Sequence, residues 1–184
     1  MKVIQAPDTY ECINEISCFM AGGMGNTEWH TRFLNELDKL NATDLVIYNP
    51  YNENITSNFS QIQWEFNYLN SCDIFSVYFD KYTNQPISMY ELGRMITLAQ
   101  PHSLQLYKDG KLFKTVPDPD SGKPCIVSLH EEAPLKEDIK IQCGLLHILA
   151  LVRTPEHHAE LVYKRYVELK AERFLNERSR KTIV

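Results

Sequence analysis

Three short apolar runs, each followed by a segment with helical periodicity, constrain the fold of this 184-residue chain more than any other feature. The runs have strand length and occupy residues 16–21, 45–48 and 74–79. Amphipathic helical patterns follow them from about residue 26, from residue 60 to about residue 70, and from residue 88. The alternation predicts an α/β domain with a flavodoxin-like or Rossmann-like parallel sheet sandwiched by helices.

Beyond Pro101 the alternation becomes irregular. Two runs at residues 103–107 and 112–116 flank Asp109-Gly110, a dipeptide typical of hairpin turns. We therefore expect an inserted hairpin over about residues 103–123. The apolar residues 125–129 then predict a further core strand.

The C-terminal region combines an apolar segment with a charged one. Residues 145–152 are nearly all apolar and predict a helical segment buried in the core or in a subunit contact. Thr154-Pro155 is a good cap and first-turn pair for a last helix that reaches about Glu177. We expect a single domain over residues 1–184, with a core at about 16–143 and a helical tail at about 144–178.

Length and composition bound the class of protein. A chain of 184 residues with 43% hydrophobic residues is long enough for one domain with a core of its own. The formal net charge of −5 argues against duplex DNA or RNA as the main partner, because such binding relies on clustered Lys and Arg. A small polar ligand is the better fit.

The five cysteines show neither C-x-x-C nor Cys/His ligand spacing, so neither a disulfide framework nor a zinc site is indicated. No metal and no cofactor are expected. The N-terminus lacks a basic start followed by an apolar segment, and the most apolar run, residues 144–152, is too short to span a bilayer. We expect a cytoplasmic protein without a membrane partner.

Glu91 is the first candidate for chemistry. It follows Ser88 by three residues, so it would be the acidic half of a capping box if the helix begins at Ser88. A carboxylate in the first helical turn is also held ionised by the helix dipole and free amides, as a nucleophile requires. Gly93, two residues on, would let a ligand or a neighbouring backbone approach closely.

Glu65 is the second unusual acid. With Ile62, Phe66 and Leu69 it falls at helical spacing on what would be one apolar face. A charge there is costly unless it is paired or used, although an acid at the edge of the face can also reach solvent. Two carboxylates on two helices of one sheet could supply the nucleophile and the acid/base of a glycosyl transfer.

A glycine-containing turn, Gly22-Gly23-Met24-Gly25, lies between the first strand and the first helix, where backbone amides can meet a phosphate or a sugar. A tight structural turn is the alternative. The turn is not G-x-G-x-x-G, and the second strand ends at Asn49 without an acidic residue for a dinucleotide ribose, which disfavours an NAD dehydrogenase. His157 and His158, on the charged last helix, are expected in solvent.

Several sequence blocks recur in an informative order: Phe19-Met20-Ala21-Gly22 with Trp29, Asn49-Pro50, Gln61-Ile62-Gln63-Trp64-Glu65, Cys72-Asp73-Ile74-Phe75, Pro86-Ile87-Ser88-Met89-Tyr90-Glu91-Leu92-Gly93 and, more weakly, residues 138–143. Together they resemble the nucleoside 2-deoxyribosyltransferase family, in particular its shorter branch found in phages and bacteria. Glu65, Asp73 and Glu91 stand 8 and 18 residues apart, as the family's acid, strand-entry Asp and nucleophile do.

The resemblance implies that Glu91 attacks the anomeric carbon and holds a covalent deoxyribosyl intermediate, with Glu65 as its acid/base partner. It places Ser88 and Tyr90 beside the sugar and its 5′ group. Gln85 stands where transferases of free nucleosides carry an Asp that contacts the base, so the base preference stays open. The family often completes its pocket with a neighbouring subunit. Residues 145–152 and the long charged helix after Pro155 exceed what the sheet needs for cover, so we expect a homo-oligomer in which this tail crosses the subunit boundary.

The sequence thus indicates an enzyme that breaks or exchanges the N-glycosidic bond of a 2′-deoxynucleoside or its 5′-monophosphate, as a transferase or a hydrolase. The catalytic candidates are Glu91 and Glu65, and the substrate-binding candidates are Gly22, Gly23, Asn49, Gln85, Ser88 and Tyr90. Two alternatives stay open. One is an N-glycosidase of another ribosyl nucleotide, such as a ribonucleotide or an NAD-related molecule. The other is a non-catalytic nucleotide sensor or assembly protein.

Overall fold

The computed structural model describes residues 1–25, 27–52, 59–99, 103–108, 111–117, 123–144 and 149–182. Its elements in chain order are β1 (Lys2–Gln5), β2 (Ile16–Gly22), α1 (Glu28–Lys39), β3 (Leu45–Asn49), α2 (Phe59–Ser71), β4 (Ile74–Phe79), α3 (Pro86–Ala99), β5 (Ser103–Lys108), β6 (Lys111–Pro117), β7 (Cys125–Leu129), α4 (Lys136–Gly144), β8 (Leu149–Leu151) and α5 (Pro155–Thr182). The predicted alternation of three strands and three helices is confirmed.

The main sheet is parallel throughout. In the described part of the chain it has six strands in the order β1-β3-β2-β4-β7-β8. Without the edge strand β1, this is the flavodoxin-like order 2-1-3-4-5, so the expected α/β class is confirmed. The strand order reverses between β2 and β4, where Gly22 pairs with Tyr78. In open parallel sheets, ligands bind beside the carboxyl ends of the strands at such a reversal.

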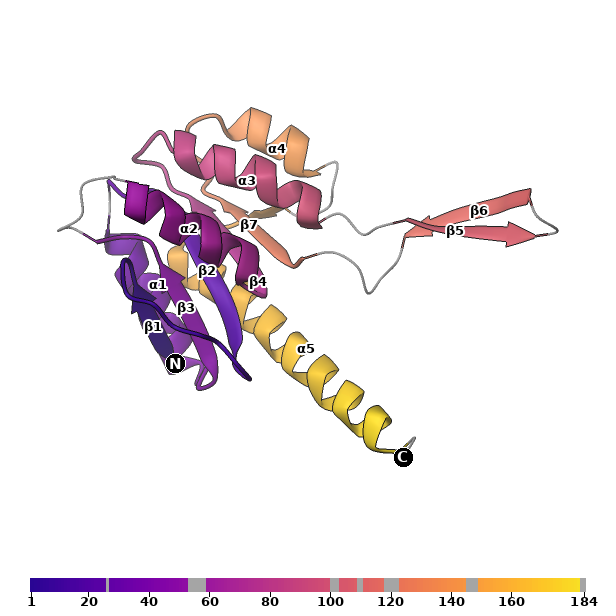
Figure 1. Ribbon diagram of the computed structural model, residues 1–184. Helices are drawn as coiled ribbons and strands as arrows, with labels where there is room; N and C mark the ends of the chain where they lie inside the picture. The colour runs from indigo at the N-terminus through magenta and orange to yellow at the C-terminus, as the bar shows by residue number, and fades with distance from the viewer. Residues whose placement is uncertain are drawn as a thin grey trace.

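Helices cover both faces of the sheet (Figure 1), with α2, α3 and α4 on one side and α1 and α5 on the other. Alternate residues of each strand supply the two cores. In β4, Phe75 and Val77 pack in the core of the α2–α4 side, while Ile74 and Tyr78 pack in that of α1 and α5. Burial on both faces explains why the strands are continuous apolar runs.

The C-terminal region differs from the prediction. The expected helical segment at residues 145–152 contains the strand β8, which pairs in parallel with β7, while residues 145–148 lie outside the described residues. A short apolar run does not distinguish a strand from a buried helix by periodicity alone. The first half of α5 packs on the face of the sheet that α1 also covers, and it buries Ala159, Val162 and Tyr166 there. The region is therefore part of the body, and only the far half of α5 extends beyond the sheet (Figure 1).

His158 corrects a second expectation. Its ring is fully buried, with Nε2 2.7 Å from the hydroxyl of Ser76 and Nδ1 2.6 Å from that of Ser128. Burial lowers the pKa of His158 to about 3, so the ring is neutral. It therefore joins α5 to β4 and β7 through hydrogen bonds inside the core. His157 is exposed, as predicted.

Two further segments frame the sheet. The predicted hairpin is present as β5 and β6, an antiparallel pair that projects away from the body (Figure 1); its turn residues 109–110 lie outside the described residues. The short strand β1 was not predicted, and it adds an edge to the sheet by pairing with β3 from Lys2 to Gln5. None of the helices in the described part combines the length and the hydropathy that a membrane span requires.

Candidate functional site

The turn after β2 packs tightly against the residues that follow β4. Gly22 has φ +155°, and a Cβ there would lie 2.8 Å from the carbonyl oxygen of Tyr78 and would also collide with the Trp29 ring. A Cβ on Gly23 would lie 2.8 Å from Oδ2 of Asp80 and 3.0 Å from Nε2 of Gln85. The two glycines are therefore needed for close packing, and they bring the carboxyl ends of β2 and β4 together.

Asn49 ends β3 at the same edge of the sheet. Its side chain is buried, and Oδ1 accepts a hydrogen bond of 3.0 Å from the backbone N–H of Tyr51. This contact fixes the direction in which the chain leaves β3. Asn49 thus shapes the edge where Gly23 and Gln85 also lie.

Helix α3 begins two residues earlier than predicted, at Pro86. Proline suits the first helical position, because its fixed φ is already helical and no N–H is lost. The backbone N–H of Met89 donates to the carbonyl of Gln85 over 3.0 Å. Glu91 is therefore the sixth helical residue, and the first turn holds no acid. Both first-turn arguments, the capping box and the ionising dipole, are wrong for Glu91.

Burial governs Glu91 instead. The side chain is only 7% exposed, and this burial, with the negative charge of Glu65, raises the pKa of Glu91 to about 8 against a weaker opposing effect of Arg94. Glu65 is half-buried, and burial raises its pKa as well, although Nε2 of Gln61 donates to Oε1 over 3.0 Å. Each carboxylate resists ionisation of the other, so the pair retains one proton near neutral pH.

The face of α2 that carries Glu65 also differs from the prediction. Ile62 and Phe66 are exposed, whereas Trp64 and Leu69 are buried. The buried stripe is displaced because Trp64 and Tyr68 pack against the ring of Tyr48 on β3. Glu65 therefore lies at the boundary between the buried and exposed faces.

Gly93 and Arg94 follow Glu91 on α3. A Cβ on Gly93 would meet nothing within 4 Å, so no neighbouring backbone requires glycine there. The guanidinium of Arg94 lies 4.1 Å from the centre of the Phe66 ring and links α3 to α2. This contact holds the helices of the two carboxylates together.

Sequence reasoning missed His30 and Asp80, which are both almost fully buried at this edge. Oδ1 of Asp80 accepts from the backbone N–H groups of Tyr82 and Thr83, at 2.8 and 3.0 Å, and from the Thr83 hydroxyl. Burial lowers the pKa of His30 to about 4, so its ring is neutral. Asp80 had a usable signal, because it directly follows a predicted strand. His30 had none beyond its place after the glycine turn.

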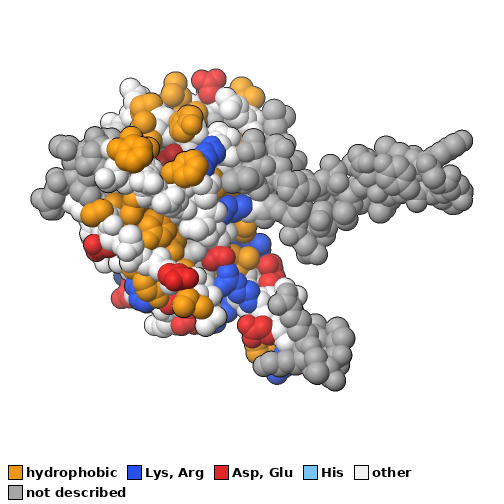
Figure 2. All heavy atoms as spheres, in the orientation of Figure 1, with side chains coloured by type: hydrophobic (Ala, Val, Ile, Leu, Met, Phe, Trp, Pro, Cys, Tyr) orange, Lys and Arg blue, Asp and Glu red, His pale blue; other side chains and the backbone are white. Residues whose placement is uncertain are grey.

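The remaining predicted residues separate into two groups. Ser88 is buried on the same helix as Glu91, whereas Tyr90 is 75% exposed and lies apart from the buried acids. Tyr90 belongs to a set of exposed apolar side chains on α2 and α3: Phe59, Ile62, Phe66, Ile87 and Tyr90. Figure 2 shows hydrophobic side chains gathered over these two helices. We call this set the α2–α3 patch.

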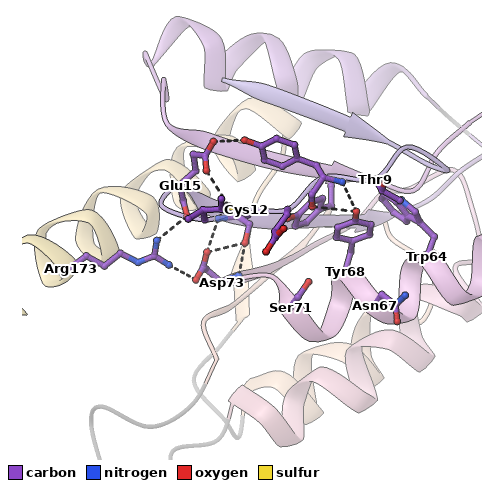
Figure 3. Close-up of a pocket in the computed structure, with 14 residues that line it drawn as sticks. Thr9, Cys12, Glu15, Trp64, Asn67, Tyr68, Ser71, Asp73 and Arg173 are labelled. Carbon is purple, nitrogen blue, oxygen red and sulfur yellow. Dashed lines mark hydrogen bonds and ion pairs between the residues drawn. The ribbon is translucent and has the colours of Figure 1, made fainter.

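A cavity of about 640 Å³ lies at the amino edge of the sheet, by the amino ends of β2 and β4 (Figure 3). It is enclosed between α2 and residues 9–15, which we call the N-terminal arm. Two of its charged groups, Asp73 and Arg173, form an ion pair with each other. Asp73 accepts from the backbone N–H and the hydroxyl of Ser17, at 2.8 and 2.9 Å, and from Arg173 at 2.5 Å. Asp73 is therefore structural, and neither Glu65 nor Glu91 is among the residues that line the cavity.

The fold and the site define an α/β protein of flavodoxin-like topology in which a buried Glu91 on α3 is coupled to a half-buried Glu65 on α2. No cluster of three His, Cys, Asp or Glu side chains that could hold a metal occurs among the described residues. Residues 15–104, which contain Glu65 and Glu91, match the family described as nucleoside 2-deoxyribosyltransferase like. This match supports the family resemblance seen in the sequence. No curated protein matches the chain significantly.

The raised pKa of Glu91 predicts a pH-dependent gain of stability in the Glu91→Gln variant. A group whose pKa is higher in the folded state favours folding below its unfolded pKa, and this advantage is lost as pH rises through the folded value. The gain should therefore appear above pH 4.5 and reach roughly 1–3 kcal/mol by pH 8. Thermal unfolding of both proteins from pH 4 to 9 measures it. Exposed Glu160→Gln is the control, and equal stability of Glu91→Gln and the parent at pH 8 would contradict the assignment.

Proposed function

We propose that this protein breaks or exchanges the N-glycosidic bond of a 2′-deoxynucleoside or its 5′-monophosphate. The observation that supports this most directly is the buried, electrostatically coupled pair Glu65 and Glu91, within the segment that matches the family. Glycosidases commonly use two carboxyl groups, one as nucleophile and one as acid/base. Burial that keeps one proton on the pair fits this division.

In the proposed reaction, ionised Glu91 attacks the anomeric carbon while the bond from that carbon to the base nitrogen breaks. The bonding electrons leave with the base, and Glu65 supplies the proton that the base needs. A glycosyl ester of Glu91 remains. Water or a second base then attacks the same carbon, Glu65 takes the proton of the acceptor, and Glu91 is released.

The reactive form therefore has its single proton on Glu65 and none on Glu91. In the free protein, the pKa of about 8 favours a protonated Glu91 at neutral pH. Positive charge that develops on the sugar as the base leaves would favour the Glu91 anion in the complex. The proton is thus expected to shift from Glu91 to Glu65 as the glycosidic bond begins to break.

The other residues proposed to bind the substrate, apart from Tyr90, belong to the carboxyl edge of the sheet and to α3. Gly22, Gly23, Asn49 and Gln85 line the carboxyl edge of the sheet, and Ser88 is buried one turn before Glu91. Transfer and hydrolysis share the first half-reaction and differ only in the acceptor. Because Gln85 stands in place of an acidic residue, another ribosyl nucleotide stays an alternative substrate.

A non-catalytic role as a nucleotide sensor or assembly protein is the second candidate. The projecting β5–β6 hairpin and the long free end of α5 favour it, because neither covers the sheet (Figure 1). The two roles differ in one measurable result. An assembly protein releases no free base from any nucleoside or nucleotide.

We also propose that the protein is a homo-oligomer that buries the α2–α3 patch. Exposed apolar side chains of neighbouring helices mark interaction sites more often than isolated ones do. In this arrangement Tyr90 lies in the contact between subunits. The first half of α5 already covers one face of its own sheet, so it is not available for the contact between subunits.

For the nucleophile, Glu91→Gln should lower turnover by roughly three orders of magnitude or more, because the covalent step is removed. The measurement is release of free base from each 2′-deoxynucleoside and each 5′-monophosphate. Glu160→Gln, with its acid exposed on α5, should retain full activity. Near-normal turnover of Glu91→Gln would remove Glu91 from the mechanism, and no release by the parent protein across the panel would favour the sensor role.

For the acid/base, Glu65→Gln should slow substrates with poorly leaving bases by roughly 10²–10⁴-fold and spare those whose base leaves without a proton. Removal of the neighbouring negative charge should also lower the pKa of Glu91, so the acidic limb of the pH–rate profile moves to lower pH. The alkaline limb should disappear. Equal losses for both substrate types with an unchanged pH profile would mean that Glu65 only positions the substrate.

For the oligomer, Ile62→Lys should weaken self-association, because it places a charge in the centre of the α2–α3 patch. Light scattering at micromolar concentration should show an oligomer for the parent and a smaller particle for the variant. Ile13→Lys is the matched control, since Ile13 is 76% exposed on the N-terminal arm, away from the patch. A monomeric parent protein would refute the proposal.

A further inference from the structure

The side chain of Gln61 joins the proposed acid/base to the end of a sheet strand. Gln61 stands four residues before Glu65 on α2, so the two side chains lie one turn apart on the same side of the helix. Nε2 of Gln61 donates to Oε1 of Glu65 over 3.0 Å and to the carbonyl of Pro50 over 3.5 Å. Pro50 directly follows β3, so the amide links Glu65 to the backbone where that strand ends.

These two contacts fix the orientation of the Gln61 amide. Its neighbours are a carboxyl oxygen and a backbone carbonyl oxygen, and the carbonyl of Pro50 is an acceptor whatever the protonation state of Glu65. The amide nitrogen carries two hydrogens and can donate to both oxygens at once, whereas the amide oxygen in its place would be repelled by the carbonyl. Gln61 therefore acts on Glu65 as a donor.

The donor acts on one oxygen of Glu65. If the proton of Glu65 were on Oε1, its O–H would face the N–H of Gln61 and the hydrogen bond would be lost. The proton is therefore directed to Oε2, while Oε1 stays an acceptor. Burial raises the pKa of Glu65, and the N–H of Gln61 opposes this rise, because a hydrogen bond to a carboxylate favours its ionised form.

We propose that Gln61 is a positioning residue for Glu65: it holds Oε1, so that Oε2 carries the proton of the acid/base. This rests on the proposed function, because it assumes that Glu65 transfers a proton during the reaction. As the bond from the anomeric carbon to the base breaks, the base takes the bonding electrons and the proton leaves Oε2 for the base. In the second half-reaction the proton of the acceptor returns to Oε2. Oε1 stays bonded to Gln61 throughout, so the carboxyl group keeps one orientation in both protonation states.

The first test follows the ionisation of Glu65 without a substrate. Carbon-13 NMR of the side-chain carboxyl groups in the Glu91→Gln protein reports the titration of Glu65 with the coupled acid removed, and adding Glu65→Gln identifies its signal. Gln61→Met removes both amide atoms at similar length, so the titration should move to higher pH. Gln61→Lys keeps an N–H donor and adds a positive charge, so the titration should move to lower pH. Mere support of the helix by Gln61 would not produce shifts of opposite sign.

The second test is a double-mutant cycle on the release of free base. With poorly leaving bases, Gln61→Met should lower turnover about 10-fold, a part of the effect of removing the acid itself, and move the alkaline limb of the pH–rate profile to higher pH. In the Glu65→Gln protein the same change should cost nothing further, because no proton remains to be positioned. Gln61→Ala serves if Gln61→Met fails to fold. Gln63→Met, at an exposed site on the same helix, is the matched control and should leave both measurements unchanged.

The two tests separate this role from the proposed function. An unchanged titration of Glu65, or equal losses from Gln61→Met with and without Glu65, would overturn the positioning role and leave the proposed function in place. No release of free base by the parent protein from any 2′-deoxynucleoside or 5′-monophosphate would overturn the proposed function, and the role of Gln61 with it.

Discussion

The mutual repulsion of two carboxyl groups held partly out of water is the interaction on which this site depends. A buried carboxylate is costly, and a second negative charge beside it increases the cost. The structure tolerates the pair because one proton stays on it, as the raised pKa values of Glu91 and Glu65 indicate. The same arrangement that lowers stability gives the site both an anion and an acid. Stability and reactivity are therefore opposed at Glu91.

The two edges of the sheet differ in a way that follows from this opposition. At the amino edge, Asp73 is fully used, with hydrogen bonds from Ser17 and an ion pair with Arg173 of α5 (Figure 3). At the carboxyl edge, Asp80 and Gln85 keep buried atoms without partners in the described residues. Satisfied polar groups rigidify a structure, whereas unsatisfied ones are retained where a ligand completes them.

Much of the fold could be predicted from the sequence, because a strand that is buried on both faces is apolar at nearly every position. β2, β3 and β4 are continuous apolar runs, and their positions were predicted to within a residue. Features set by tertiary contacts could not be predicted. The stripe of α2 was misplaced because aromatic packing of Trp64 on Tyr48 outweighs the periodicity of Ile62 and Phe66. β8 lies within residues 145–152, which were taken for a helical segment because a short apolar run does not distinguish a strand from a buried helix.

The candidate site was predictable in its acids and less so in their surroundings. Glu91 and Glu65 could be selected from spacing, but the reason given for Glu91 changed once the helix began at Pro86, since one extra half-turn carries the acid from the helix end into the interior. His158 shows the same limit, because its charged neighbours on α5 concealed a buried position between Ser76 and Ser128. Local sequence fixes which residue types are present, whereas burial, which sets their pKa, comes from elements distant in the chain.

The pair of glutamates and the hydrogen-bonding groups of His30 and Asp80 belong to different elements of the fold. Glu65 and Glu91 lie on α2 and α3, whereas the neutral His30 ring belongs to α1 and Asp80 follows β4. Under the proposed function, a ligand in contact with both groups would meet the pair that carries the proton at one end and hydrogen-bond donors and acceptors at the other. Two backbone N–H groups of the turn hold Oδ1 of Asp80 in place. The Asp80 side chain is therefore fixed, whereas the proton on the Glu65–Glu91 pair can move. Recognition can then stay constant while the protonation state changes during the reaction, which requires the two tasks to be carried by different side chains.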